Sequence, residues 1–102
     1  MNKMQYKLTA KFIFHNKEKL SVTWLEADLM KDGKGEDGVV GPVPLTVEEV
    51  EMHFRSVFLQ FMKSRDRMSI PSITGYVEII PFEEVFRMSF KVEHYGGGSL
   101  DV

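Results

Sequence analysis

The sequence predicts an α+β fold of order ββαββ, in which a four-stranded antiparallel sheet of two hairpins is covered on one face by one amphipathic helix. Two observations predict this fold. Apolar and polar residues alternate near both ends of the chain, as in strands that bury one face. In the middle, apolar residues recur every three to four positions, as on one side of a helix. A sheet and a helix that each have one apolar side bury those sides against each other, which gives a two-layer arrangement.

The first strand is expected over residues 6–14, where every second residue is apolar: Tyr6, Leu8, Ala10, Phe12 and Phe14. The polar run 15–19 predicts a turn, and the alternation resumes at Leu20, Val22 and Trp24. These segments are predicted to form a hairpin.

The register of this hairpin raises one conflict. Pairing Phe14 with Leu20 places Leu8 opposite Glu26. A β-bulge at Trp24–Leu25 removes the mismatch, because the alternation then changes side. Bulges are frequent at sheet edges, so we expect the second strand at an edge and the first and last strands side by side.

Residues 30–45 are rich in glycine and proline and have no sustained period, so a flexible loop is expected there. Residues 33–38 match the pattern G-x-G-x-x-G, which in dinucleotide-binding proteins joins a strand directly to a helix. Here the expected helix begins well after Gly38, and Glu36 and Asp37 would repel phosphate. The run also lacks the alternating oxygen ligands of a calcium loop. Neither ligand is predicted to bind here.

Thr46 and Glu49 have the spacing of a capping box and predict the start of the helix. An apolar stripe follows on one side: Val50, Phe54, Val57, Phe58 and Phe61. The basic residues between 63 and 67 and the Ile70–Pro71 step predict the end of the helix in this region.

Residues 75–95 are expected to form the second hairpin, with a turn at 81–84. This pairing places Ile80 opposite Val85 and Glu78 opposite Arg87. The buried side of the last strand is then expected to carry Phe86, Met88, Phe90 and Val92.

The composition suits one ordinary domain, since the chain has 102 residues of which 43% are hydrophobic and 27% charged. We expect this α+β domain to span residues 1–96 and to be followed by a disordered tail over 97–102. A formal net charge of −2 creates no general attraction to nucleic acid or anionic membranes. The chain has no cysteine and no apolar run long enough for a signal peptide or a membrane span, so a cytoplasmic protein is expected.

The sequence predicts no catalytic, cofactor-binding or metal site. Glu49 and His53 lie one helical turn apart, but a metal site needs at least a third ligand. Nothing in the sequence places His15 or His94 near these two residues. No serine or threonine lies in a nucleophile-elbow pattern. An enzyme would need His53 or His94 to meet a carboxylate in a concave pocket.

Candidate binding residues lie on the outward side of the predicted strands. Lys7 and Lys11 on the first strand and Arg87 and Lys91 on the last would form a basic stripe opposite the helix. Apolar groups that the helix cannot cover are expected beside it and in the loop: Ile13, Leu25, Val39 and Val40.

We therefore predict a small non-enzymatic module that binds a protein partner, as an inhibitor or accessory factor of phage or mobile-element type does. The alternative is weak nucleic-acid binding by the basic stripe. Sheets that bind nucleic acid usually add exposed aromatic rings for base stacking, and only Tyr76 and Tyr95 are candidates for this in the sequence. A homodimer through a sheet edge or face is also compatible with the sequence.

Overall fold

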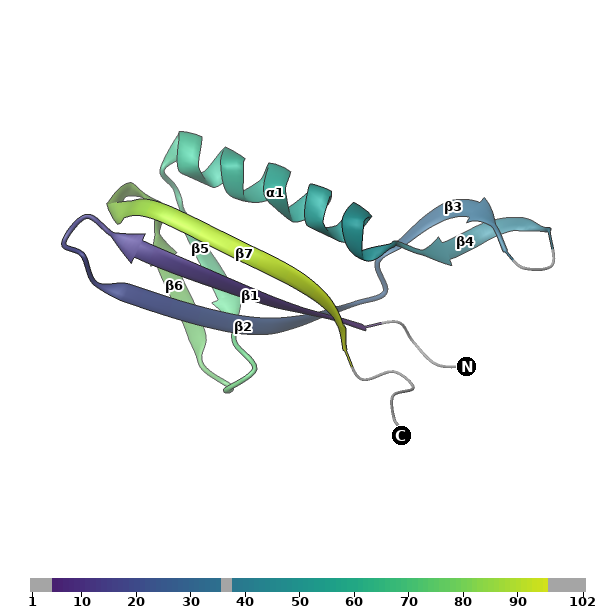
Figure 1. Ribbon diagram of the computed structural model, residues 1–102, viewed down its shortest axis with the longest axis horizontal. Coiled ribbons are helices and arrows are strands. Elements are labelled where there is room, and N and C mark those ends of the chain that lie inside the picture. The colour runs from purple at the N-terminus through teal and green to yellow at the C-terminus, as the bar shows by residue number, and fades with distance from the viewer. Residues whose placement is uncertain (1–4, 36–37, 96–102) are drawn as a thin grey trace.

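A computed structural model describes residues 5–35 and 38–95. Within them the fold is α+β, with one α-helix and seven strands whose pairs are all antiparallel. The strands form a three-stranded sheet of order β2–β1–β7 and two separate two-stranded sheets, β3–β4 and β5–β6. The expected fold class is confirmed, whereas the four-stranded sheet of two hairpins is not observed (Figure 1). The tail expected over 97–102 lies outside the described residues.

The first hairpin joins β1 (Gln5–Phe14) to β2 (Lys19–Ala27) in a register shifted by two residues from the expected one. Phe12, not Phe14, pairs with Leu20, because the turn is tighter than expected: Lys17 adopts a φ of 73° and its N–H bonds to the Phe14 carbonyl at 2.8 Å. A shift of two preserves the inward and outward sides of both strands.

The bulge expected at Trp24–Leu25 is wrong, because in the observed register Leu8 faces Trp24 and no mismatch arises there. Glu26 lies opposite Tyr6 instead, and its carboxylate accepts a hydrogen bond from the Trp24 indole at 3.0 Å. The edge position expected for this strand is confirmed.

The last strand, β7 (Val85–Tyr95), lies along the other side of β1, so the first and last strands are neighbours as expected. Their register is continuous from Gln5–Tyr95 to Ile13–Arg87 and then shifts, since Phe14 pairs with Val85. Phe86 is the extra residue at this bulge and is 65% exposed, while Val85 is buried. The expectation that Phe86 is buried with Met88, Phe90 and Val92 is therefore wrong, because the bulge turns it outward.

The helix α1 (Val47–Ser64) begins with the predicted capping box. The Glu49 N–H donates to Thr46 Oγ1 at 3.2 Å, and the Thr46 N–H donates to the Glu49 carboxylate at 2.9 Å. Val50, Phe54 and Phe58 are its buried residues. Arg65 ends the helix in the left-handed conformation, within the region where the sequence predicted the end.

The second expected hairpin is wrong, because β6 (Val77–Pro81) pairs with β5 (Arg67–Pro71) and not with the last strand. The residues expected to turn instead form a short 3-10 helix, η1 (Phe82–Glu84), whose Phe82 side chain is buried in the core. The chain is thereby carried away from β6 before β7 begins. Glu78 consequently faces Ile70 rather than Arg87.

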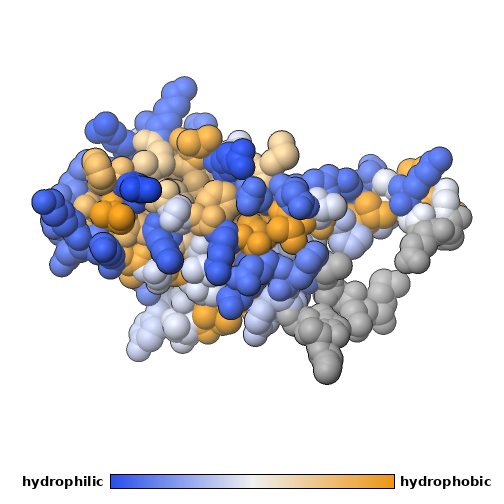
Figure 2. Space-filling model, viewed as in Figure 1, coloured by the Kyte–Doolittle hydropathy of each residue, from blue (hydrophilic) through white to orange (hydrophobic). Residues whose placement is uncertain are grey.

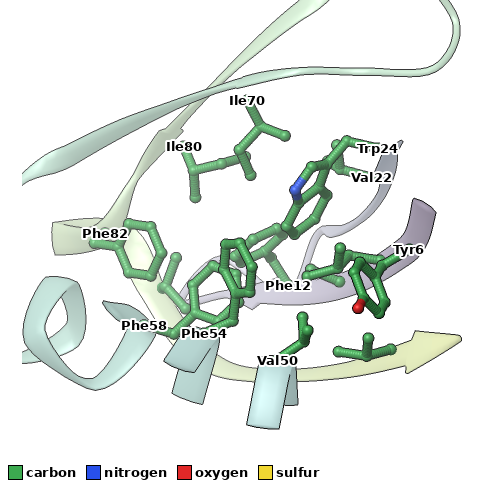
Figure 3. Close-up of a cluster of buried hydrophobic side chains, with 14 residues drawn as sticks. Tyr6, Phe12, Val22, Trp24, Val50, Phe54, Phe58, Ile70, Ile80 and Phe82 are labelled. Carbon is green, nitrogen blue, oxygen red and sulfur yellow. The ribbon is translucent and has the colours of Figure 1, made fainter. Parts of the chain in front are cut away.

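The core lies between the three-stranded sheet, the helix and the β5–β6 hairpin (Figure 3). The Trp24 ring meets the rings of Phe54 and Phe58 edge to face, each at a centroid distance of 6.1 Å. Ile70 and Ile80 point into the same cluster from β5 and β6 and are 2% and 0% exposed. The helix and the β5–β6 hairpin thus cover the inner face of the sheet together, while the opposite face stays open.

The hairpin of β3 (Met30–Lys34) and β4 (Val40–Pro44), called the arm below, projects from one end of the molecule (Figures 1 and 2). Within the segment 30–45, where a flexible loop is expected, residues 30–34 pair with residues 40–44 as strands, with Gly33 opposite Gly41. Prolines are tolerated in such a ribbon because each strand has a free edge. The molecule measures 52 Å along its longest axis and 30 and 18 Å along the others.

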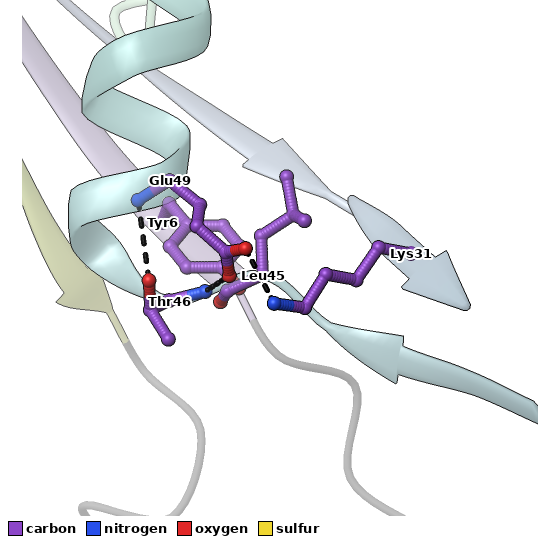
Figure 4. A network of polar contacts seen from close by, with 5 residues as sticks. All are labelled: Tyr6, Lys31, Leu45, Thr46 and Glu49. Atoms are coloured by element: carbon purple, nitrogen blue, oxygen red, sulfur yellow. Dashed lines mark hydrogen bonds and ion pairs between the residues drawn. The ribbon is translucent and has the colours of Figure 1, made fainter. Parts of the chain in front are cut away.

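The arm is fastened where it meets the helix, at a group of polar contacts called the junction below (Figure 4). The Lys31 ammonium pairs with the Glu49 carboxylate, and the Tyr6 hydroxyl donates to the Leu45 carbonyl. The hydrogen bond from Lys31, followed by that from the Thr46 backbone, holds the pKa of Glu49 below its ordinary value. Burial, followed by the charge of Glu49, raises the pKa of Tyr6.

Candidate functional site

The open face of the β2–β1–β7 sheet, called the open face below, brings most of the predicted site residues together. Lys7, Lys11 and Ile13 lie on β1, on the side opposite the fully buried Leu8, Ala10 and Phe12. Leu25 flanks Lys7 on β2, while Arg87 and Lys91 flank Ile13 and Thr9 on β7. The adjacency of β1 and β7 therefore produces the expected basic stripe as one continuous surface.

Most cations of the open face lie opposite neutral side chains, whereas Lys7 lies opposite Glu93 on β7. Lys11 lies between Ser21 and Ser89, and Lys91 lies opposite Thr9. Ile13 separates Lys19 from Arg87. No cation directly faces another cation on a neighbouring strand, which limits the repulsion that like charges cause in cross-strand pairs.

Most of these cations have no acidic partner. Glu93 is the carboxylate of the open face, and it pairs with Lys91 at 3.5 Å. In the described part of the chain, no carboxylate forms an ion pair with Lys7, Lys11, Lys19 or Arg87. A chain of net charge −2 thus presents a surface of positive charge here.

The open face is shallow. One depression of about 420 Å³ lies around Lys11, Ile13, Lys19 and Arg87, and a neighbouring one of about 340 Å³ lies around Lys7, Thr9, Thr23 and Lys91. Hydroxyl side chains are part of the lining of both, and the Thr9 and Thr23 hydroxyl oxygens lie 3.4 Å apart. Such a surface suits contact with a macromolecule better than enclosure of a small substrate.

Val39 and Val40 are not part of the open face. They lie near the tip of the arm and are 63% and 67% exposed. The sequence groups them with Ile13 and Leu25 only as uncovered apolar residues, and the structure places the two pairs on different surfaces.

Lys19, which lines the larger depression beside Arg87, is not among the predicted site residues. Its position before Leu20 in the alternating pattern nevertheless marks it as outward-facing. The outer side of β6 was not predicted as exposed either, although Val77 and Ile79 are 60% and 62% exposed there. This surface was not predicted because the sequence pattern was interpreted as a pairing of β6 with β7, whereas β6 pairs with β5.

The histidines pack on aromatic rings. His15 contacts Phe86, His53 contacts Phe54 and His94 contacts Tyr6, at centroid distances of 5.8, 5.0 and 5.6 Å. Glu49, the carboxylate nearest to His53 in the helical pattern, pairs with Lys31 instead. Across residues 5–35 and 38–95, no group of three or more metal-ligating side chains lies close enough together to hold an ion.

The glycine run at 33–38 falls in the arm. Gly33 belongs to β3, and Gly38 adopts a φ of 78° before β4, while Glu36 and Asp37 lie outside the described residues. The described glycines therefore shape a hairpin and do not join a strand to a helix.

Within the described residues, no helix has both the length and the apolar character needed to cross a membrane. Comparison with protein families, curated proteins and solved structures yields no match. The function must therefore be argued from the surfaces of this chain alone.

Proposed function

We propose that the protein is a non-enzymatic binding module whose open face engages an acidic surface of a partner protein. The observation that carries this proposal is the set of cations without carboxylate partners: Lys7, Lys11, Lys19 and Arg87. Acidic groups of a partner would supply the missing counter-charges, and complementary charge speeds association and selects the partner.

A protein partner is favoured over nucleic acid by the apolar residues among the cations. Ile13 is half-buried between Lys19 and Arg87, and Leu25 is 37% exposed beside Lys7. Protein interfaces combine such apolar groups with a polar surround. Sheets that bind single-stranded nucleic acid instead present aromatic rings for stacking.

The nucleic-acid alternative rests on the same cations. Tyr95 lies at one end of the open face, opposite Gln5, and is 39% exposed. Phe86, which the bulge turns outward at the other end, is 65% exposed and packs on His15. Tyr76 is 74% exposed but precedes β6, away from the stripe. Neither tyrosine lies between two cations of the stripe, where a stacked base would contact both cations.

The test uses two probes of equal charge: an acidic peptide that contains leucines and a single-stranded oligonucleotide. Binding of each is measured by fluorescence anisotropy with the wild type and with K11E/R87E. We expect the wild type to bind the peptide and the double variant to bind it about tenfold or more weakly. The matched control is R55E/K63E, the same charge change on the solvent side of α1, which should leave peptide binding unchanged.

The apolar residues separate the two partners. I13S/L25S should weaken the peptide complex, while an oligonucleotide held by its phosphates should be insensitive to this change and should dissociate steeply with salt. Tight oligonucleotide binding that depends only on the cations would replace the protein proposal with the nucleic-acid one. If neither probe binds, and affinity capture from host lysate yields the same proteins with the wild type and with K11E/R87E, the open face is not the binding surface.

A further inference from the structure

The outer edge of β7 is an unpaired strand edge. Its 11 residues make β7 about twice as long as a typical strand, and in the described part of the chain it pairs only with β1. Every second residue of an edge strand directs its N–H and C=O away from the sheet, and these groups can pair with another strand. Figure 1 shows β1 on one side of β7 and the helix α1, but no strand, along the other.

The opposite edge of the same sheet is partly covered. The Ile73 N–H, in the loop between β5 and β6, donates to the carbonyl of Thr23 in β2 at 2.8 Å. Pairing of a further strand along β2 would therefore have to displace the β5–β6 hairpin. Within the described residues, β7 is therefore the edge of this sheet to which no further strand or hairpin is bonded.

The core beside β7 is also incompletely covered. Met88 and Phe90 face the inner side of the sheet but remain half-buried, whereas Leu8, Ala10 and Phe12 on the central strand are 0% exposed. The Phe90 ring contacts Phe58 of the helix at a centroid distance of 5.1 Å and still keeps part of its surface uncovered. A strand added along β7 would cover these groups.

The charges of β7 determine which strand fits. If β7 of a second copy lies antiparallel with Phe90 facing Phe90, then Arg87 faces Glu93, Ser89 faces Lys91 and Met88 faces Val92. Opposite charges and apolar side chains that lie directly opposite each other stabilise the pairing of two strands. Centring on Ser89 would place Arg87 opposite Lys91, and centring on Lys91 would place Lys91 opposite itself, so repulsion disfavours the neighbouring registers.

The bulge does not obstruct this pairing. It lies at Phe86, and the β1–β7 register is continuous from Arg87 to Tyr95. The self-complementary stretch Arg87–Glu93 therefore lies entirely in regular strand. A foreign strand would have to match the same sequence of charges, whereas a second copy matches it by symmetry.

We infer that the protein forms a symmetric homodimer through antiparallel pairing of β7 with β7 of a second copy, centred on Phe90. The two three-stranded sheets then become one continuous sheet, and both open faces lie on the same side of it. This dimer does not depend on the function proposed for the open face. Arg87 is then paired with Glu93 of the second copy, and Lys7, Lys11 and Lys19 of each copy remain on one joint open face.

The first experiment is a charge swap followed by sedimentation velocity over a range of concentrations. R87E places Glu opposite Glu93 and E93R places Arg opposite Arg87, so each should raise the dimer dissociation constant about tenfold or more. The double variant R87E/E93R keeps the net charge and restores the pairing, so dimerisation should return toward the wild-type level. K11E changes the net charge as R87E does, but on the central strand, and should leave the dimer nearly unchanged.

The second experiment uses the absence of native cysteine. A mixture of S89C and K91C should form a disulfide-linked heterodimer under mild oxidation, because these positions face each other across the proposed axis. A mixture of S21C and K91C is the matched control, since Ser21 is exposed on the same face but lies on β2. It should not cross-link.

A wild-type protein that sediments as a monomer at every concentration would overturn this inference. So would a dimer that is insensitive to R87E and gives equal cross-linking in both cysteine mixtures, since that dimer would use another surface. Neither result bears on peptide binding by the open face. Because R87E disturbs both surfaces, the single variant K11E, which leaves the dimer nearly unchanged, tests peptide binding separately.

Discussion

The arm and the β5–β6 hairpin are built alike and differ in where their side chains go. Each pairs two strands of five residues, and the strands of neither hairpin belong to a larger sheet. The β5–β6 hairpin buries Ile70 and Ile80 in the core, while within β3 and β4 no residue is buried. The same backbone arrangement is therefore part of the core in one case and a projection in the other.

This difference shows that hairpin pairing by itself stabilises little. An isolated two-stranded ribbon is marginal in water, so each hairpin depends on what fastens it to the body. The β5–β6 hairpin is fastened by apolar burial, and the arm by the junction around Lys31, Glu49 and Tyr6. The predictions below test these two kinds of attachment.

The largest effect is expected at Ile80. I80A should lower the free energy of unfolding by about 2–5 kcal/mol, because it leaves a cavity at a site that is 0% exposed. I79A is the control. Ile79 lies on the outer side of β6 and is 62% exposed, so this substitution should change the free energy of unfolding by less than about 0.5 kcal/mol. Urea unfolding followed by circular dichroism measures both, and equal losses would mean that the β5–β6 hairpin is not fastened by burial.

A smaller effect is expected at the start of the helix that links the two hairpins. T46A removes the side-chain oxygen that accepts from the Glu49 N–H and should cost about 1 kcal/mol. T46S keeps this oxygen and should retain most of the stability. Thermal unfolding of the three proteins decides this, and T46S behaving like T46A would argue against the capping box.

Two glycines that face each other across the arm should respond differently to alanine. A Cβ at Gly33 would lie 2.9 Å from Val43 Cγ2, while one at Gly41 meets nothing within 4 Å. G33A should therefore speed amide hydrogen exchange in β3 and β4, because the branched Val43 side chain has little freedom to move aside. G41A should slow exchange slightly, since it restricts the unfolded arm. Unchanged exchange in the β5–β6 hairpin is expected for both variants.

The smallest effect concerns the pH dependence of the junction. The pKa of Glu49 is lowered from its ordinary value of 4.5, so its ionised form is favoured in the folded protein. The stabilisation is therefore complete above about pH 4.5 and is lost as the pH falls through the lower folded pKa. The melting temperatures of the wild type and E49Q should differ most near neutral pH and converge in acid. If the melting temperatures still differ in acid, the loss of stability in E49Q comes from an interaction other than the ion pair of Glu49.

Local patterns were sufficient for the elements whose period is long and regular. The alternation of residues 6–14 and the stripe of the helix predicted β1 and α1, and the capping box predicted the helix start. The outward side of β1 follows from the same alternation, which is why the sequence places Lys7, Lys11 and Ile13 on one face. Lys19 could have been assigned in the same way.

Local patterns failed where several partners were compatible with one strand. Ile80 fits equally well opposite Val85 in a tight hairpin and opposite Met68 in the observed one. What excludes the first pairing is Phe82, whose burial turns the chain at η1. The bulge that exposes Phe86 is likewise a consequence of how β7 meets the end of β1.

The sequence by itself determined the fold class, the helix and the buried side of β1, because these depend on side-chain periods of two and of three to four residues. Only the tertiary structure decided which strands are neighbours, that β3 and β4 project as an arm and that β6 joins β5. Pairing between strands depends on which surfaces can be buried together in one core, and that competition involves residues far apart in the chain.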